Sequence, residues 1–280
     1  MSNQVTFQPL TGCIGARVDG IDLDAELSDE SFAQIRQGLL EYKALLVPGQ
    51  DLTPAAHVAL GARLGELVPR HPDYPTIEGF ENIMVIENGP ERPPDNEFWH
   101  KDMTYRPDPP HCSLLQARVL PPHGGDTMFA NMQAVYEDLS PPLQSMLGQL
   151  SVVHDQVTGF EKTLLQNGEF ERLDKIKNQA ENQRRNVHPA VGVHPLTGYK
   201  YLGIDDCFVS HFVELSKAES DGLLRVLREI FKQPKYHVRI NWNPYDLAIW
   251  DNICTLHYAV GDYQEYRRMQ RVTVSRFHGA

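Results

Sequence analysis

Short apolar runs separated by proline and glycine turns recur along this chain of 280 residues, and this rhythm constrains the fold more than any other feature. Helical patterns gather near the start of the chain and before the last strands. We therefore predict a mainly β fold with helices, a jelly-roll barrel decorated by α-helices. The runs that predict strands lie at residues 44–47, 83–86, 114–120, 127–130, 236–242, 246–250 and 268–277.

Several helices have recognisable start signals. Ser28 precedes two acidic residues that would occupy a first helical turn. Residues 53–67 begin with Thr-Pro, and proline is favoured at the first helical position. Ser216 and Glu219 have the spacing of a capping box. Residues 131–150 also predict a helix, which two consecutive prolines interrupt.

Composition excludes several classes of protein. The net charge is −11, from 37 acidic and 26 basic residues, and no lysine or arginine block is present, so nucleic acid is not an expected partner. An anionic substrate would need its own local arginines. Four scattered cysteines without C-x-x-C spacing indicate free thiols rather than a zinc ribbon or disulfide framework. No signal peptide or long apolar run is evident, so we expect a cytoplasmic protein that does not bind membranes.

Residues 155–186 are polar, charged and poor in aliphatic side chains. By composition this is the segment least able to fold by itself. It could be a mobile lid over a site or a plain solvated insertion. No convincing domain boundary accompanies it, so we predict a single domain spanning residues 1–280.

The run FWHKDMT at residues 98–104 places a histidine and a carboxylate two positions apart. If the run is extended, His100 and Asp102 point to the same side of the strand. They would then form two thirds of the two-histidine, one-carboxylate triad that holds non-haem Fe(II). A surface histidine near a solvated carboxylate is the alternative.

The third ligand must come from elsewhere, and His257 has the most suggestive setting among twelve histidines. It follows a predicted strand and a short turn, although a core histidine held by a backbone carbonyl is an alternative. Further on, arginines precede and enter an apolar strand at residues 266–274. Arginine suits such a place where it meets a carboxylate, which its guanidinium binds with two hydrogen bonds. A solvated edge strand is the other interpretation.

Taken together, these residues resemble the taurine dioxygenase family of Fe(II)- and 2-oxoglutarate-dependent oxygenases over nearly the whole chain. The matching motifs are WHKD at 99–102, GGDT at 124–127, WDN at 250–252 followed by His257, and RRMQRVT at 267–273. The resemblance implies a double-stranded β-helix in which His100, Asp102 and His257 bind iron.

The same resemblance implies a site for 2-oxoglutarate. Thr127, Trp250 and one C-terminal arginine would bind it. Spacing from the distal histidine favours Arg268, whereas matching the motif as a block favours Arg267. We prefer Arg267, because strand register is harder to change than loop length, and Arg268 stays open.

A substrate site is also implied. His71, Asn96 and Arg271 stand where family members that act on taurine contact its sulfonate and amine. Further residues could help to form the pocket, and these are Tyr74, Met103, Phe129, Phe160 and Phe208.

The resemblance implies hydroxylation of a small anionic substrate with Fe(II), 2-oxoglutarate and O₂, giving succinate and CO₂. A sulfonate such as taurine would then yield an aldehyde and sulfite. Alternative substrates are aryloxyalkanoates, alkyl sulfates and amino-acid-derived biosynthetic intermediates. Two other classes stay open, a zinc hydrolase that uses the same three ligands and a non-catalytic barrel that binds a small anion. We also expect a homo-oligomer, either a dimer or a tetramer.

Overall fold

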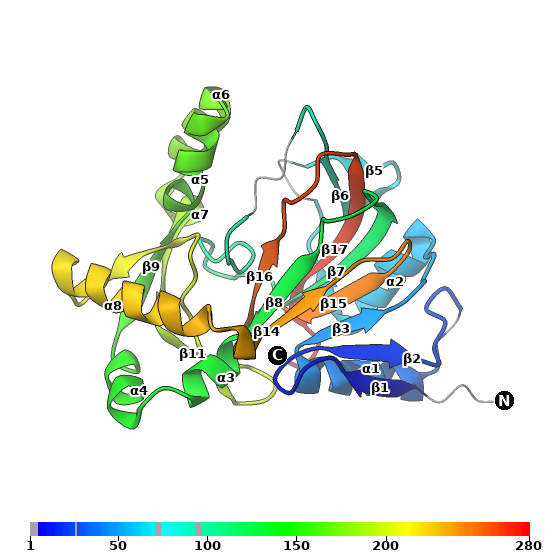
Figure 1. The fold of residues 1–280 in the computed structure, drawn as a ribbon, viewed down its shortest axis with the longest axis horizontal. Coiled ribbons are helices and arrows are strands. Elements are labelled where there is room, and N and C mark those ends of the chain that lie inside the picture. Colours follow the sequence, from blue (N-terminus) through cyan, green and yellow to red (C-terminus); the bar gives the residue numbers. More distant parts are fainter. Residues whose placement is uncertain (1–4, 26, 71–73, 93–96) are drawn as a thin grey trace.

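The structure is a computed structural model, and it describes residues 5–25, 27–70, 74–92 and 97–280 (Figure 1). Within these ranges the largest sheet runs in the order β1-β2-β3-β15-β7-β17-β6-β5, and β4 pairs with β17 outside this path. All its neighbours are antiparallel except β2 and β3. Its strands are β1 (Thr6–Pro9), β2 (Ala16–Asp19), β3 (Ala44–Val47), β4 (Gly65–Leu67), β5 (Thr76–Ile77), β6 (Phe80–Asn88), β7 (Cys112–Val119), β15 (Leu247–Asp251) and β17 (Arg267–Phe277).

A smaller sheet, ordered β14-β8-β16, lies beside the large sheet (Figure 1). It consists of β14 (His237–Ile240), β8 (Thr127–Asn131) and β16 (Thr255–Ala259). A shared apolar core joins the two sheets, with Leu115, Trp250 and Met269 from the large sheet and Phe129 and Ile240 from the small one. Two sheets packed over one core form the jelly-roll barrel that the strand pattern predicts.

The helices and two smaller sheets surround this barrel. Strands β10 (Arg185–Pro189), β9 (Ser151–Asp155) and β13 (Val209–Phe212) form one sheet, and β11 (Val191–Val193) and β12 (Lys200–Leu202) form another. The helices are α1 (Asp29–Tyr42), α2 (Pro54–Leu64), α3 (Met132–Glu137), α4 (Pro141–Leu147), α5 (Gln156–Gln166), α6 (Phe170–Lys177), α7 (Glu181–Arg184), α8 (Lys217–Phe231) and the 3₁₀ turn η1 (Pro234–Tyr236). No helix within the described ranges has the length and apolar composition of a membrane span. Cytoplasmic location and homo-oligomeric assembly stay predictions.

The helix start signals agree with the structure. The Ser28 hydroxyl accepts a hydrogen bond from the backbone of Ser31 at the start of α1. At α8, the Ser216 side chain accepts from the Glu219 backbone, and the Glu219 carboxylate accepts from the Ser216 backbone. A reciprocal cap of this kind satisfies amide groups that would otherwise lack partners at the helix start.

Several local predictions were wrong. Residues 98–104 do not form a strand, because His100 makes only an isolated bridge and a turn begins at Asp102. Helix α2 ends at Leu64 because residues 65–67 pair with β17. By contrast, the interruption predicted within residues 131–150 is confirmed, because α3 ends at Glu137 and the two prolines begin the separate helix α4.

Residues 155–186 contain α5, α6 and α7, and Leu164, Leu173 and Ile176 form a small apolar cluster of their own. This cluster gives the segment a small apolar core although it contains few aliphatic residues. The role of this segment as a mobile lid or a solvated insertion stays a prediction, as does the single domain spanning residues 1–280.

Helix α2 contains a buried histidine that should make stability depend on pH. His57 is fully buried, and its Nε2 lies 3.2 Å from the carbonyl oxygen of Leu114. Burial lowers the pKa of His57 to about 4. As the pH falls, His57 therefore becomes protonated near pH 6.5 in the unfolded chain but only near pH 4 in the folded protein. Stabilisation by neutral His57 is complete above pH 6.5 and is lost as the pH falls toward 4.

We predict that His57→Gln flattens this dependence. Between pH 7.5 and pH 5, the wild-type free energy of unfolding should fall by about 2 kcal/mol more than that of the variant. Urea unfolding at both pH values measures the difference. Equal slopes for the two proteins would show that His57 does not titrate in this way.

Candidate active site

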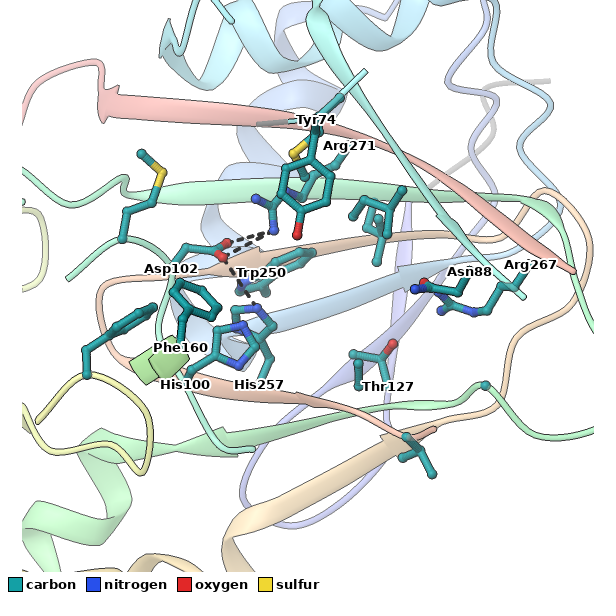
Figure 2. Close-up of a pocket in the computed structure, with 18 of the residues that line it drawn as sticks. Tyr74, Asn88, His100, Asp102, Thr127, Phe160, Trp250, His257, Arg267 and Arg271 are labelled. Carbon is teal, nitrogen blue, oxygen red and sulfur yellow. Dashed lines mark hydrogen bonds and ion pairs between the residues drawn. The ribbon is translucent and has the colours of Figure 1, made fainter. Parts of the chain in front are cut away.

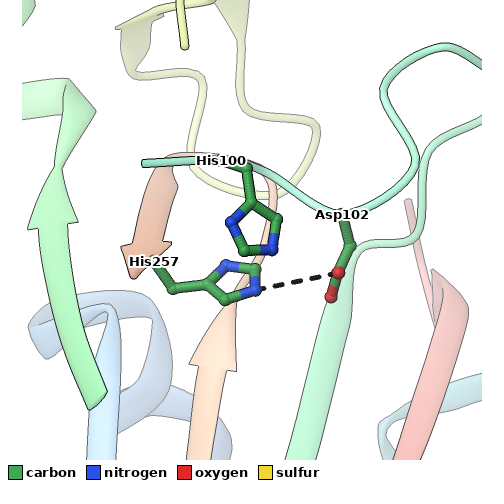
Figure 3. A group of neighbouring side chains, drawn as sticks. All are labelled: His100, Asp102 and His257. Atoms are coloured by element: carbon green, nitrogen blue, oxygen red, sulfur yellow. Dashed lines mark ion pairs between the residues drawn. The ribbon is translucent and has the colours of Figure 1, made fainter. Parts of the chain in front are cut away.

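Two histidines face each other across a single backbone bridge at one end of the barrel (Figure 3). The His100 amide donates to the His257 carbonyl at 3.0 Å, and the His257 amide donates to the His100 carbonyl at 2.8 Å. Their ring centroids lie 4.0 Å apart. Because His257 belongs to β16, this bridge attaches residues 98–104, and with them the turn that begins at Asp102, to the small sheet.

Asp102 is held in that turn by a buried asparagine. The Asp102 amide donates to Asn252 Oδ1 at 3.0 Å, and Asn252 Nδ2 donates to the Pro110 carbonyl at 2.7 Å. The next residue, Met103, has a φ of 55°, a left-handed conformation that L side chains rarely adopt. The turn aims the carboxylate at the histidines, and Asp102 Oδ1 lies 3.7 Å from His257 Nε2. Asn252 belongs to the WDN motif at residues 250–252, but the sequence alone does not indicate this role.

The three side chains are buried, and one potential ligand atom from each lies within 4.8 Å of the others. His100 Nδ1 lies 2.9 Å from the carbonyl oxygen of Phe98, so Nε2 remains for a metal. Two imidazole nitrogens and one carboxylate oxygen are the donor set of non-haem Fe(II) oxygenases. The residues present therefore fit the iron that the sequence predicts.

The protonation states also suit metal binding, which needs a neutral imidazole and an ionised carboxylate. Burial and the neighbouring His100 keep the pKa of His257 well below 6.5. Burial alone would raise the pKa of Asp102, but Arg271, His257 and His100 hold it well below its ordinary range. Asp102 is therefore an anion and His257 is neutral at physiological pH.

A pocket extends from these three residues (Figure 2). Thr127, Trp250 and Arg267 line it, and the Arg267 side chain is buried at 6% exposure. Arg268 does not line it, because its guanidinium faces Glu87 at 3.6 Å on the surface. Of the two arginines left open by the sequence, Arg267 is the one that lines this pocket.

Arg271 also lines the pocket and pairs with the carboxylate of the triad (Figure 2). Its Nη1 lies 3.2 Å and 3.1 Å from the two oxygens of Asp102. Its Nε is buried and has no hydrogen-bond partner among the described residues. The guanidinium therefore retains donor capacity for an anion beside the three ligands.

The substrate residues suggested by the sequence divide into three groups. Tyr74, Met103, Phe160 and Phe208 line the pocket. Phe129 does not, because it is fully buried in the barrel core with its ring 5.4 Å from that of Trp250. His71 and Asn96 lie outside the described residues.

Several lining residues were not predicted. Tyr105 lies just beyond the turn that holds Asp102, Asn88 ends β6, and Tyr263 lies in the loop before β17. Helix α5 contributes Gln156, and α6 contributes Arg172 and Ile176. Helical spacing offered a usable signal, because Gln156 and Arg172 each lie four positions before an apolar lining residue.

Comparison with known proteins agrees with this geometry. The family model described as "Taurine catabolism dioxygenase TauD, TfdA family" matches residues 6–273. An alkylsulfatase of Acinetobacter baylyi is 33% identical over 98% of this chain and 86% of its own length. An alpha-ketoglutarate-dependent sulfate ester dioxygenase of Pseudomonas putida is 31% identical over 97% and 90%. The crystal structure of a taurine dioxygenase from Burkholderia xenovorans has a TM-score of 0.82 and 31% identity, over 96% and 89%.

The chain belongs to the TauD/TfdA family of dioxygenases. It is a 2-oxoglutarate-dependent dioxygenase, an oxidoreductase, and its cofactors are Fe(II), 2-oxoglutarate and O₂. Membership of this family favours the oxygenase over the zinc hydrolase and the non-catalytic barrel.

We predict that Asp102→Ala weakens Fe(II) binding at least a hundredfold, because the variant loses one of three ligands and leaves Arg271 unpaired. Anaerobic equilibrium dialysis measures the affinity.

Cys254→Ala is the control, since Cys254 lies in a second buried group with His194 and Asp251. There His194 Nδ1 accepts from the Leu196 amide, so Nε2 carries the proton that it donates to Asp251 at 2.8 Å. Unchanged affinity in Asp102→Ala, or an equal loss in Cys254→Ala, would contradict the assignment.

Proposed function

We propose that the protein oxidises a small organic sulfate ester, with an alkanesulfonate as the next best substrate. The observation that carries this proposal is Arg271, whose side chain is 11% exposed and whose guanidinium lines the pocket beside Asp102. A planar guanidinium suits an oxyanion such as sulfate or sulfonate. The Acinetobacter alkylsulfatase and the Pseudomonas sulfate ester dioxygenase support the choice of a sulfate ester.

The remaining pocket suits an apolar substrate body. Tyr74, Met103, Phe160 and Phe208 provide aromatic and thioether surfaces. Among the described lining residues the carboxylates are Asp102, which Arg271 binds, and Asp126, to which Asn241 donates at 2.9 Å. Neither carboxylate is free to bind the ammonium group of taurine, so a simple alkyl chain fits better than an aminoalkyl chain.

We assign the other ligands as follows. His100, Asp102 and His257 would hold Fe(II), and Arg267 with Thr127 would bind the distal carboxylate of 2-oxoglutarate. Burial lowers the pKa of Arg267, but the usual value is so high that the guanidinium stays charged at neutral pH. Arg271 would bind the sulfate oxyanion of the substrate.

Fe(II) held by His100, Asp102 and His257 would supply the oxidation of a substrate C–H bond by O₂, coupled to the conversion of 2-oxoglutarate to succinate and CO₂. The residues of this chain select which carbon is oxidised. Arg271 would hold the sulfate next to the three ligands, which brings the carbon attached to the ester oxygen closest to them. The hydroxylated ester then breaks its C–O bond to sulfate and gives an aldehyde and sulfate. An alkanesulfonate would give an aldehyde and sulfite in the same way.

Substrate-dependent succinate formation tests the proposal. We predict that alkyl sulfates of three to eight carbons support turnover with a higher kcat/KM than the alkanesulfonates of equal length, taurine or a phenoxyacetate. Arg271→Gln should raise the KM for alkyl sulfates at least tenfold and change the KM for 2-oxoglutarate little. Arg267→Gln should have the opposite effect, and Arg268→Gln, on the surface, is the matched control.

A preference for taurine would replace the proposed substrate class, sulfate esters, by aminosulfonates. A preference for the phenoxyacetate would replace the sulfate ester by an aryloxyalkanoate. If Arg267→Gln and Arg271→Gln exchanged their effects, the roles of the two arginines would be reversed.

A further inference from the structure

The active-site pocket contains one polar side chain that the assignments above do not use. Gln156 is the first residue of α5 and lines the pocket, with 4% of its surface exposed. Its Oε1 is buried and has no hydrogen-bond partner among the described residues. A buried amide oxygen without a partner is unfavourable, because folding removes its hydrogen bonds to water and does not replace them.

Phe160 and Phe208 line the same pocket as Gln156. Phe160 lies one helical turn further along α5, so the two residues share a face of the helix. The Phe160 ring lies 5.6 Å from the ring of Phe208 and also belongs to the cluster around Met103. A glutamine on this wall therefore puts a hydrogen-bond acceptor where the proposed alkyl chain would lie.

Helix α6 closes the same wall with a positive charge. Arg172 lines the pocket, its Nη1 pairs with Glu169 at 3.2 Å, and its guanidinium lies 5.8 Å from the centre of the Phe160 ring. Arg267 and Arg271 line the pocket as well. A pocket lined by three arginines disfavours an ammonium group, so a hydroxyl is the donor that best suits the Gln156 acceptor.

From this geometry we propose that Gln156 is a substrate-binding residue that accepts a hydrogen bond from a hydroxyl group on the substrate chain. The substrate class narrows to hydroxyalkyl sulfates, held by Arg271 at the sulfate and by Gln156 at the hydroxyl. This inference rests on the proposed function. A site built to hydrogen-bond a substrate hydroxyl discriminates strongly against the analogue that lacks it, because the site's own polar group then stays unpaired.

Two matched series of substrates test the inference in the loaded enzyme. The short series is 2-hydroxyethyl, propyl and 2-aminoethyl sulfate, and the long series is 4-hydroxybutyl, pentyl and 4-aminobutyl sulfate. Within a series only the terminal group differs. We expect the wild type to prefer the hydroxyl member over the alkyl member about tenfold in kcat/KM in at least one series, mainly through KM, and to use the ammonium member least.

Gln156→Met keeps the length of the side chain and removes both polar atoms. It should reduce the preference for the hydroxyl member to about one while leaving the KM for 2-oxoglutarate and the melting temperature near their wild-type values. Gln166→Met is the control, since Gln166 ends the same helix and is exposed. It should keep the wild-type preference.

A hydroxyl preference that survives in Gln156→Met would overturn the assignment, as would a wild-type preference for the alkyl member in both series. A preference for the ammonium member would overturn the choice of a hydroxyl. If Gln156→Met unfolds, Gln156→Glu, which keeps an oxygen acceptor, must retain the hydroxyl preference or the assignment fails. Absence of substrate-dependent succinate with all six sulfates would refute the proposed function itself and this inference with it.

Discussion

The backbone bridge between His100 and His257 is the interaction on which the rest of the site depends. Two hydrogen bonds of 3.0 Å and 2.8 Å place these residues opposite each other, although they are far apart in the sequence. Asn252 then fixes the turn that carries Asp102. Because these contacts hold the backbone of all three candidate ligands, the residues are positioned before a metal binds, and less conformational entropy remains to be lost on binding.

Strand β17 gives the pocket two separate positive charges, Arg267 and Arg271, that could bind two different anionic ligands. Arg267 and Arg271 lie four positions apart on β17, so both point into the barrel, yet only Arg271 contacts the triad. This separation allows one guanidinium to bind the distal carboxylate of 2-oxoglutarate and the other to bind the substrate. The acidic net charge of the whole chain does not oppose anion binding, because Arg267 is buried and the Arg271 side chain is only 11% exposed, so both charges act locally in the pocket.

Much of the fold and of the candidate site could be predicted from the sequence, and the features that could not be predicted have physical reasons. Short apolar runs between turns and N-capping residues predicted the barrel and the starts of α1 and α8, since both signals depend on neighbouring residues. The turn that carries Asp102 was mistaken for a strand, because Asn252 is distant in the sequence and stabilises a left-handed Met103 that local preference disfavours. Phe129 was predicted to line the pocket, but an alternating strand pattern does not distinguish a core-facing side chain from a pocket-facing one. Gln156 and Arg172 were missed because low aliphatic content concealed two helices.

The central claim is that Fe(II) and 2-oxoglutarate bind together in one pocket, with the metal on the triad and the distal carboxylate on Arg267. Anaerobic addition of Fe(II) and then 2-oxoglutarate tests it most directly, because chelation of Fe(II) by a 2-oxo acid produces a visible metal-to-ligand charge-transfer band. The account predicts a band that saturates at one 2-oxoglutarate per chain, that needs much more 2-oxoglutarate in Arg267→Gln, and that is unchanged in Arg268→Gln. Absence of the band in the wild type, or an equal response in the two arginine variants, would contradict it.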